Sequence, residues 1–327
     1  MKNRQVISDW LKGIGIILMV YGHIIYVGSW ANFQIHNIKP IIYSFHMPLF
    51  LVMSGFFFNL DKDPFQSSKD VIHRLVTPYL IFGSLYISAV TIIQKAGVPT
   101  TTVPPVSFLN FLEIIFFHPR GPYWFIHSLI VIRLCLALSK TINLRLKIDD
   151  SNFLLTSIFL LAISCYFNLL LPSTAFYFFI GIVLNRFYGR LPSLKIIGFL
   201  FTIAIFLLAR SEIFLFSIVQ VAWCLSIISF LVGIGKSLEK TLLVSIFAWL
   251  GQNSLIILII HPIFTMLLKP ISKLLLMIDE TGFTYSVIVL ISAMIGSIVS
   301  ASLFDKYKIS TYLFGVENIC SRFRYPI

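Results

Sequence analysis

Three ionisable side chains share one face of the first hydrophobic segment: Asp9, Lys12 and His23. On an α-helix each residue turns by about 100°, so the eleven residues from Lys12 to His23 bring these two side chains back to nearly the same bearing. The same stretch rises roughly 16 Å, about half of a bilayer core. We therefore expect a cation near one membrane surface and an imidazole in line with it near the midplane.

An imidazole at that depth has two interpretations. It is either a packed, hydrogen-bonded helix histidine or a general base, because imidazole exchanges its proton near neutral pH. Ionisable groups inside a membrane are costly and usually functional, which favours the second interpretation for His23. Asp9 lies about 20 Å from His23 along the helix, so it cannot orient the ring directly.

Two further histidines adjoin prolines. His46 stands two residues before Pro48, and His261 stands directly before Pro262. Proline removes a backbone donor and can open a helix, which allows a polar site within an apolar segment. We expect both histidines toward the outer side of the membrane, where His46 is either an interfacial residue or part of an acceptor site.

Other polar residues lie in or beside apolar segments. Arg74 is at the cytoplasmic mouth of the third segment, where it is either a topological anchor or a phosphate ligand. Arg133 lies inside the fourth segment and must find an anion or a water-filled cavity. Asn253 and Ser254 should face protein rather than lipid. Trp124 and His127 are two more candidate site residues. Their stretch is also typical of the aromatic belt at a membrane interface.

The elements that position these residues are membrane helices. The 327 residues are 58% hydrophobic and only 12% charged, with a mean hydropathy of +0.92, which excludes an ordinary soluble domain. The net charge of +12 does not indicate nucleic-acid binding, because Lys and Arg are scattered in short loops between apolar runs. The four cysteines show no C-x-x-C spacing, so we expect free thiols and no metal site.

We predict an all-α, polytopic transmembrane bundle of about ten spans. A cleavable signal peptide is the weaker alternative for the first run, which is long, contains His23 and precedes many similar runs. The loop over 94–121 carries an apolar patch at 108–117 that we expect to form an interfacial or re-entrant helix. The predicted spans are residues 11–30, 40–59, 74–93, 122–139, 152–171, 174–188, 194–210, 213–234, 243–267 and 284–304.

The distribution of Lys and Arg orients the bundle. With the N-terminus inside, eighteen of the 25 basic residues fall on the inner side and six on the outer side, with Arg133 within the membrane. Both termini are therefore predicted to be cytoplasmic. We expect one transmembrane domain over residues 1–304 and a short cytoplasmic tail over 305–327.

A polar bundle interior would also fit a transporter or flippase for a lipid-linked sugar, although the sequence shows neither inverted repeats nor paired broken helices. The motifs are more specific in combination. The chain resembles the acyltransferase-3 family of integral membrane O-acyltransferases, in particular the short, stand-alone bacterial polysaccharide O-acetyltransferases. The matching stretches are residues 9–13, 22–23, 45–50, 54–56, 74, 78–79, 124–125, 250–251, 253–255 and 261.

The resemblance implies an enzyme of the bacterial inner membrane. The donor would be cytoplasmic acetyl-CoA, and the acceptor a hydroxyl of a cell-surface glycan or its lipid-linked precursor. An enzyme that transfers another acyl group, such as succinyl, is the alternative. His23 matches the family's essential first-helix histidine, which acts as a general base or carries the acetyl group. About twenty residues follow the last span, so we expect no appended SGNH-type esterase domain.

The resemblance also assigns supporting roles. Lys12, at a position that is often arginine, and Arg74 would meet the phosphates of the coenzyme. Val71 stands where many members have the first arginine of a paired R-x-x-R, so Lys69 or His73 would substitute for it. The residues expected on the acceptor side or in support are Asp9, His46, Trp124, His127, Asn253, Ser254 and His261.

Overall fold

The computed structural model describes residues 6–95, 97, 102–147, 152–321 and 323. Within these ranges the chain is helical and contains no strand, which confirms the all-α prediction. Four of the basic residues counted on the inner side lie outside the described ranges: Lys2, Arg4, Arg322 and Arg324.

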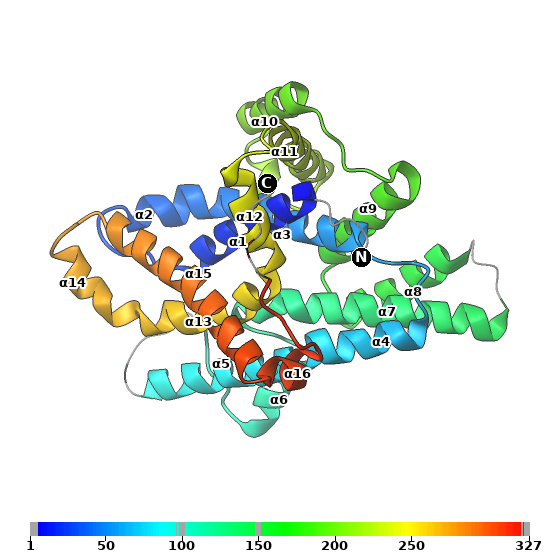
Figure 1. Cartoon of the computed structure of the whole chain (residues 1–327), viewed down its shortest axis with the longest axis horizontal. Coiled ribbons are helices and arrows are strands. Elements are labelled where there is room, and N and C mark those ends of the chain that lie inside the picture. Colours follow the sequence, from blue (N-terminus) through cyan, green and yellow to red (C-terminus); the bar gives the residue numbers. More distant parts are fainter. Residues whose placement is uncertain (1–5, 96, 98–101, 148–151, 322, 324–327) are drawn as a thin grey trace. The chain divides into compact units, whose positions relative to one another are not determined.

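The helices form two compact units (Figure 1). Unit 1 comprises Met1–Phe58, Tyr177–Leu303 and Ile319–Ile327, and unit 2 comprises Asn59–Phe176 and Phe304–Asn318. Unit 1 holds α1 (Val6–His23), α2 (Ala31–Phe33), α3 (Lys39–Phe56), α10 (Lys195–Leu208), α11 (Ile218–Ser237), α12 (Leu242–Gln252), α13 (Ser254–Leu267) and α14 (Ser272–Leu276). Unit 2 holds α4 (Pro64–Val71), α5 (Thr77–Lys95), α6 (Phe108–Phe116), α7 (Trp124–Leu146), α8 (Phe153–Tyr166) and α16 (Ile309–Phe314). Two helices contribute to both units, namely α9 (Pro172–Val183) and α15 (Phe283–Lys306).

Each predicted span coincides with one of these helices or with a helix pair. By length and composition, four helical segments could cross a membrane, and a fifth could do so if the bent pair α12 and α13 counts as one span. The four are Pro64–Lys95, Phe108–Leu146, Ile218–Ser237 and Phe283–Lys306. The chain is therefore a membrane protein by these criteria, while the count of ten spans and the cytoplasmic termini stay predictions.

The structure corrects the first span. The sequence predicted a helix through residue 30, but α1 ends at His23, so this histidine closes the helix instead of lying inside it. Gly28 has a positive φ of 82°, and the amide of Ser29 donates to the carbonyl of Glu280 at 2.9 Å. A Cβ on Gly282 would lie 1.9 Å from the carbonyl oxygen of Val27. A close contact with a distant loop therefore ends the helix.

The predicted span over 243–267 is also corrected. It is interrupted at Asn253, where α12 and α13 meet at an angle of 78°. The Asn253 carboxamide accepts from the Ser321 amide at 2.8 Å and donates to the carbonyls of Trp249 at 2.9 Å and Ser321 at 3.3 Å. These side-chain bonds to the backbone of Trp249 and Ser321 compensate for helical backbone hydrogen bonds lost at the bend.

Helices α1 and α12 cross without intervening side chains, because a glycine faces the partner backbone on each. A Cβ on Gly13 would lie 1.8 Å from the carbonyl oxygen of Phe247, and one on Gly251 would lie 1.8 Å from that of Asp9. Small residues allow such close approach between apolar helices, and membrane bundles use it widely. The crossing holds α1 on α12, which leads into α13.

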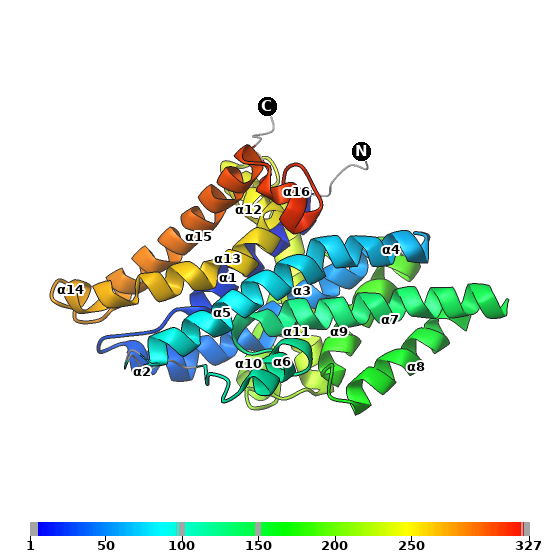
Figure 2. The same cartoon turned by 90° about the horizontal axis from the view of Figure 1, so that it is seen from below.

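In unit 2, helix α7 packs against both α4 and α8. Helices α4 and α7 lie side by side (Figure 2). The Lys140 ammonium of α7 donates to the carbonyls of Leu60 at 2.8 Å and Lys62 at 3.0 Å, in the segment before α4. The apolar patch expected at 108–117 is the helix α6, which begins after the N-cap Ser107. That expectation of a helix is confirmed.

Candidate functional site

Three histidines from three helices of unit 1 form one cluster. The ring of His23, at the end of α1, lies 5.5 Å from that of His261 in α13. Tyr43 of α3 lies 6.1 Å from His23 and 5.0 Å from His46, between ring centroids. The sequence placed His23 at a different depth from the other two histidines, so the shared cluster corrects that arrangement.

Two of these rings have an assigned tautomer. His46 Nδ1 lies 2.7 Å from the carbonyl oxygen of Ile42, and His261 Nδ1 lies 3.0 and 2.9 Å from those of Ile257 and Leu258. A carbonyl oxygen only accepts, so each Nδ1 carries the proton and each neutral Nε2 carries a lone pair. The hydrogen bonds thus orient both rings.

Both Nε2 atoms are buried and have no hydrogen-bond partner among the residues that the structure describes. His46 and His261 are themselves fully buried. A buried acceptor without a partner costs free energy of about 1–3 kcal/mol, so its retention calls for a ligand or a functional use. The two lone pairs can accept a proton or a hydrogen bond from a bound hydroxyl or from a neighbouring ring.

Tyr43 and Lys39 complete the cluster, and sequence reasoning missed both. The Tyr43 hydroxyl donates to the carbonyl of Gly22 at 3.1 Å, which ties α3 to the end of α1 beside His23. The Lys39 ammonium lies 5.4 Å from the centre of the Tyr43 ring. Tyr43 stands three residues before His46, a spacing that puts both on one helix face and was visible in the sequence.

Lys12 and Asp9 form an ion pair with 3.6 Å between Nζ and Oδ1. Asp9 is almost completely buried, and the Lys12 ammonium also lies 4.7 Å from the centre of the Phe57 ring. The carboxylate and the ring together hold the ammonium in place. The structure thus brings Asp9 and Lys12 together on α1, as their spacing predicts.

Arg74 belongs to unit 2. It is exposed on a π-helical turn, Ile72–Val76, between α4 and α5. Val71, three residues earlier, is fully buried and packs inside the unit, so its side chain is not available to a ligand. Lys69 and His73, the expected substitutes, lie on the same continuous helical stretch as Arg74, Pro64–Lys95.

His127 and Trp124 lie in the first turn of α7. His127 Nε2 lies 2.9 Å from the carbonyl oxygen of Phe116, and its ring packs 5.9 Å from that of Tyr79. His127 therefore holds the end of α6 against α5 and α7. Trp124 packs at 6.1 Å against its neighbour Phe125. Ser254 begins α13, directly after the bend at Asn253.

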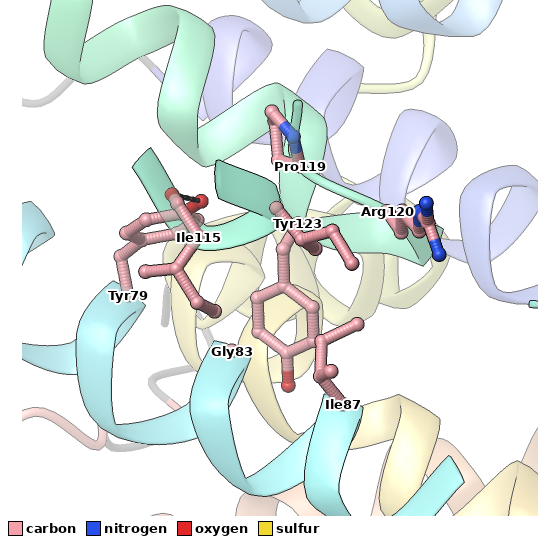
Figure 3. A pocket seen from close by; sticks show the side chains of 8 residues that line it. Tyr79, Gly83, Ile87, Ile115, Pro119, Arg120 and Tyr123 are labelled. Carbon is pink, nitrogen blue, oxygen red and sulfur yellow. Dashed lines mark hydrogen bonds between the residues drawn. The ribbon is translucent and has the colours of Figure 1, made fainter. Parts of the chain in front are cut away.

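Unit 2 contains a small pocket lined by residues of α5, α6 and the segment before α7. It is mainly apolar, and the Tyr123 ring extends between Gly83 and Ile87 of α5 (Figure 3). No residue predicted for the site lines it. The lining consists of Tyr79, Gly83, Ile87, Ile114, Ile115, Pro119, Arg120 and Tyr123.

The four cysteines are free thiols. Across the described part of the chain, no group of three His, Cys, Asp or Glu side chains is arranged to hold a metal ion. The imidazoles of the cluster in unit 1 can perform proton transfer and nucleophilic catalysis.

Comparison with known proteins places the chain in a family. The family model described as an acyltransferase domain matches residues 6–302. Nodulation protein NolL of Sinorhizobium fredii (strain NBRC 101917 / NGR234) is 42% identical over 57 residues, 16% of each chain. Nodulation protein NolL of Mesorhizobium japonicum is 30% identical over 153 residues, 45% of this chain and 38% of that protein. Each match thus covers less than half of the relative's length, and no solved structure matches. Because the family match extends over nearly all of the described helices, the chain belongs to the acyltransferase-3 family of membrane O-acyltransferases.

Proposed function

We propose that this protein moves an acetyl group from cytoplasmic acetyl-CoA to a hydroxyl of a cell-surface glycan or its lipid-linked precursor, in the bacterial inner membrane. The observation that supports this proposal best is the histidine cluster of unit 1. His23 closes α1 there, 5.5 Å from a second imidazole whose lone pair is buried. A hydroxyl that enters such a site meets bases that hydrogen bonds have already oriented.

His23 is proposed to act as the general base. It takes the proton of the acceptor hydroxyl while the oxygen attacks the thioester carbonyl carbon; a C–O bond forms and the C–S bond breaks. The proton then passes to the leaving coenzyme sulfur, so the imidazole returns to its starting state. Tyr43 acts as a positioning residue, because its hydroxyl holds the backbone at Gly22 next to His23.

The second route uses His23 as an acyl carrier. The imidazole nitrogen first attacks the thioester carbonyl carbon; a C–N bond forms, the C–S bond breaks, and coenzyme A leaves as the thiol with the proton of the imidazole. The acceptor oxygen then attacks the acetyl-imidazole; a C–O bond forms, the C–N bond breaks, and the hydroxyl proton returns to the imidazole. The two routes differ in one measurement. Protein incubated with radiolabelled acetyl-CoA and no acceptor retains the label in the carrier route and stays unlabelled in the base route.

The donor is proposed to enter from the cytoplasmic side. Lys12 in unit 1 and Arg74 in unit 2 are each proposed to meet coenzyme phosphates, as the family resemblance implies. Arg74 is exposed and its guanidinium suits bidentate phosphate binding. Lys12 is a point charge that Asp9 and Phe57 already orient.

The test is acetyl transfer by the purified full chain in lipid nanodiscs. Radiolabelled acetyl-CoA is offered with a panel of surface polysaccharides and polyprenyl-linked oligosaccharides, and succinyl-CoA serves as the competing donor. We expect His23→Ala to lose roughly 10²–10⁴-fold in rate per folded molecule with coenzyme A binding retained. His36→Ala, at an exposed histidine of the same unit, is the matched control and should keep full activity. Near wild-type transfer by folded His23→Ala would refute the assignment.

A further inference from the structure

Arg133 is a cation within the apolar helix α7 of unit 2. Its side chain is half-buried, and its Nε is buried without a hydrogen-bond partner among the described residues. Burial of a guanidinium is costly unless an anion accepts its hydrogen bonds. The mechanism proposed for the histidine cluster makes no use of Arg133, so its retention needs a separate explanation.

Two elements that contact α7 each carry a charged residue: Asp70 lies on α4 and Arg74 on the π-helical turn Ile72–Val76. Asp70 of α4 attracts the guanidinium and Arg74 of the π-helical turn repels it. The Asp70 carboxylate is already engaged, since one oxygen forms an ion pair with Lys62 and the other accepts from the Gln66 side chain at 3.4 Å. Asp70 is thus shared among several donors and does not neutralise Arg133 alone.

The surrounding charges leave a net positive site. On or beside the paired helices α4 and α7 the basic residues outnumber the acidic ones: Lys62, Lys69, Arg74, Arg133 and Lys140 against Asp61, Asp63 and Asp70. Two guanidinium groups that repel each other in the empty protein are stabilised when an anion lies between them. Phosphate is the anion that matches the planar donor fork of arginine best.

We propose that Arg133 and Arg74 together bind a phosphate group of the acyl donor. This inference rests on the proposed function and deepens it, since Arg133 would supply the second guanidinium that the buried Val71 does not. The π-helical turn that carries Arg74 contacts α7, which carries Arg133, so both arginines lie in one unit of the fold. Helix α4, which leads into that turn, lies beside α7 in Figure 2. A coenzyme carries phosphate esters and so does a phospholipid headgroup, so the experiment must separate these two sources.

The test measures binding of coenzyme A and of phosphate-free pantetheine to the full chain in zwitterionic nanodiscs. We expect Arg133→Gln to weaken coenzyme A binding at least tenfold and to leave pantetheine binding unchanged. Arg133→Lys restores the charge without the bidentate fork and should recover part of the affinity. Arg145→Gln, at an exposed arginine near the end of the same helix, is the matched control and should bind coenzyme A like the wild type.

Three outcomes overturn the inference, and they are distinguishable. Equal coenzyme A affinity in the wild type and Arg133→Gln removes the role of Arg133 and leaves the proposed function intact. Equal loss of coenzyme A and pantetheine affinity means that the residue is structural. If the wild type does not bind coenzyme A but retains an anionic phospholipid that Arg133→Gln loses in native mass spectrometry, the site holds a lipid headgroup and the proposed donor is wrong.

Discussion

Replacement of Gly13 by alanine tests whether the crossing of α1 and α12 positions the site. The added Cβ would lie 1.8 Å from the carbonyl oxygen of Phe247 and 2.6 Å from its carbon. An ordinary contact begins at about 3.4 Å, so α12 would have to move away by about 1.6 Å. The obstacle is backbone, which cannot rotate aside as a side chain can.

The expected cost follows from two opposing effects. Overpacking of a well-packed interior costs about 1–3 kcal/mol, and a backbone obstacle belongs at the upper end of that range. Alanine in place of a helical glycine gains about 0.5–1 kcal/mol, because it restricts the unfolded chain. We therefore expect Gly13→Ala to lower the free energy of unfolding by about 2 kcal/mol and the melting temperature by roughly 3 °C.

Gly83→Ala provides the matched control. It is the same substitution in helix α5, where the nearest atoms to the added Cβ are side-chain carbons at 3.8 and 3.9 Å. We expect its melting temperature to equal or slightly exceed that of the wild type. The assay is a thermal unfolding curve of each variant in the same detergent, with acyl transfer measured alongside. Equal melting temperatures for Gly13→Ala and Gly83→Ala would refute the reasoning.

Two further predictions concern Asp279, which lies before α15, and Asn253, which lies at the bend between α12 and α13. Asp279 accepts hydrogen bonds from the Thr281 side chain and amide and from the Thr284 amide, and these bonds lower the pKa of the carboxyl. A depressed folded pKa stabilises the protein above the unfolded value near 3.9 and the effect is lost as the pH falls. Asp279→Asn should therefore melt below the wild type at pH 7, with the gap closing below about pH 4 in a pH series of melting curves. Asn253→Ala removes the bonds to Ser321 and should speed proteolysis after residue 314, measured by limited digestion; unchanged cleavage would contradict this.

The positions of the helices could be predicted from the sequence. Apolar runs of the required length form helices because backbone groups in lipid must be satisfied within the segment. Each predicted span accordingly overlaps a helix or a helix pair, and the apolar patch at 108–117 is helical as expected. The motif residues Asp9, Lys12 and His23 were identified by type and spacing, and the family by the resemblance of the combined motifs.

Only the tertiary structure decided where helices stop and which polar groups meet. The end of α1 depends on a loop around Glu280, and the bend at Asn253 depends on Ser321, each far away in the sequence. His23, His46 and His261 were found singly as polar residues in apolar runs, but their meeting depends on how α1, α3 and α13 pack. Helix formation is local, whereas packing depends on glycine contacts and side-chain shapes across the whole unit. The sequence therefore determined the elements and the candidate chemistry, and the fold determined the cluster.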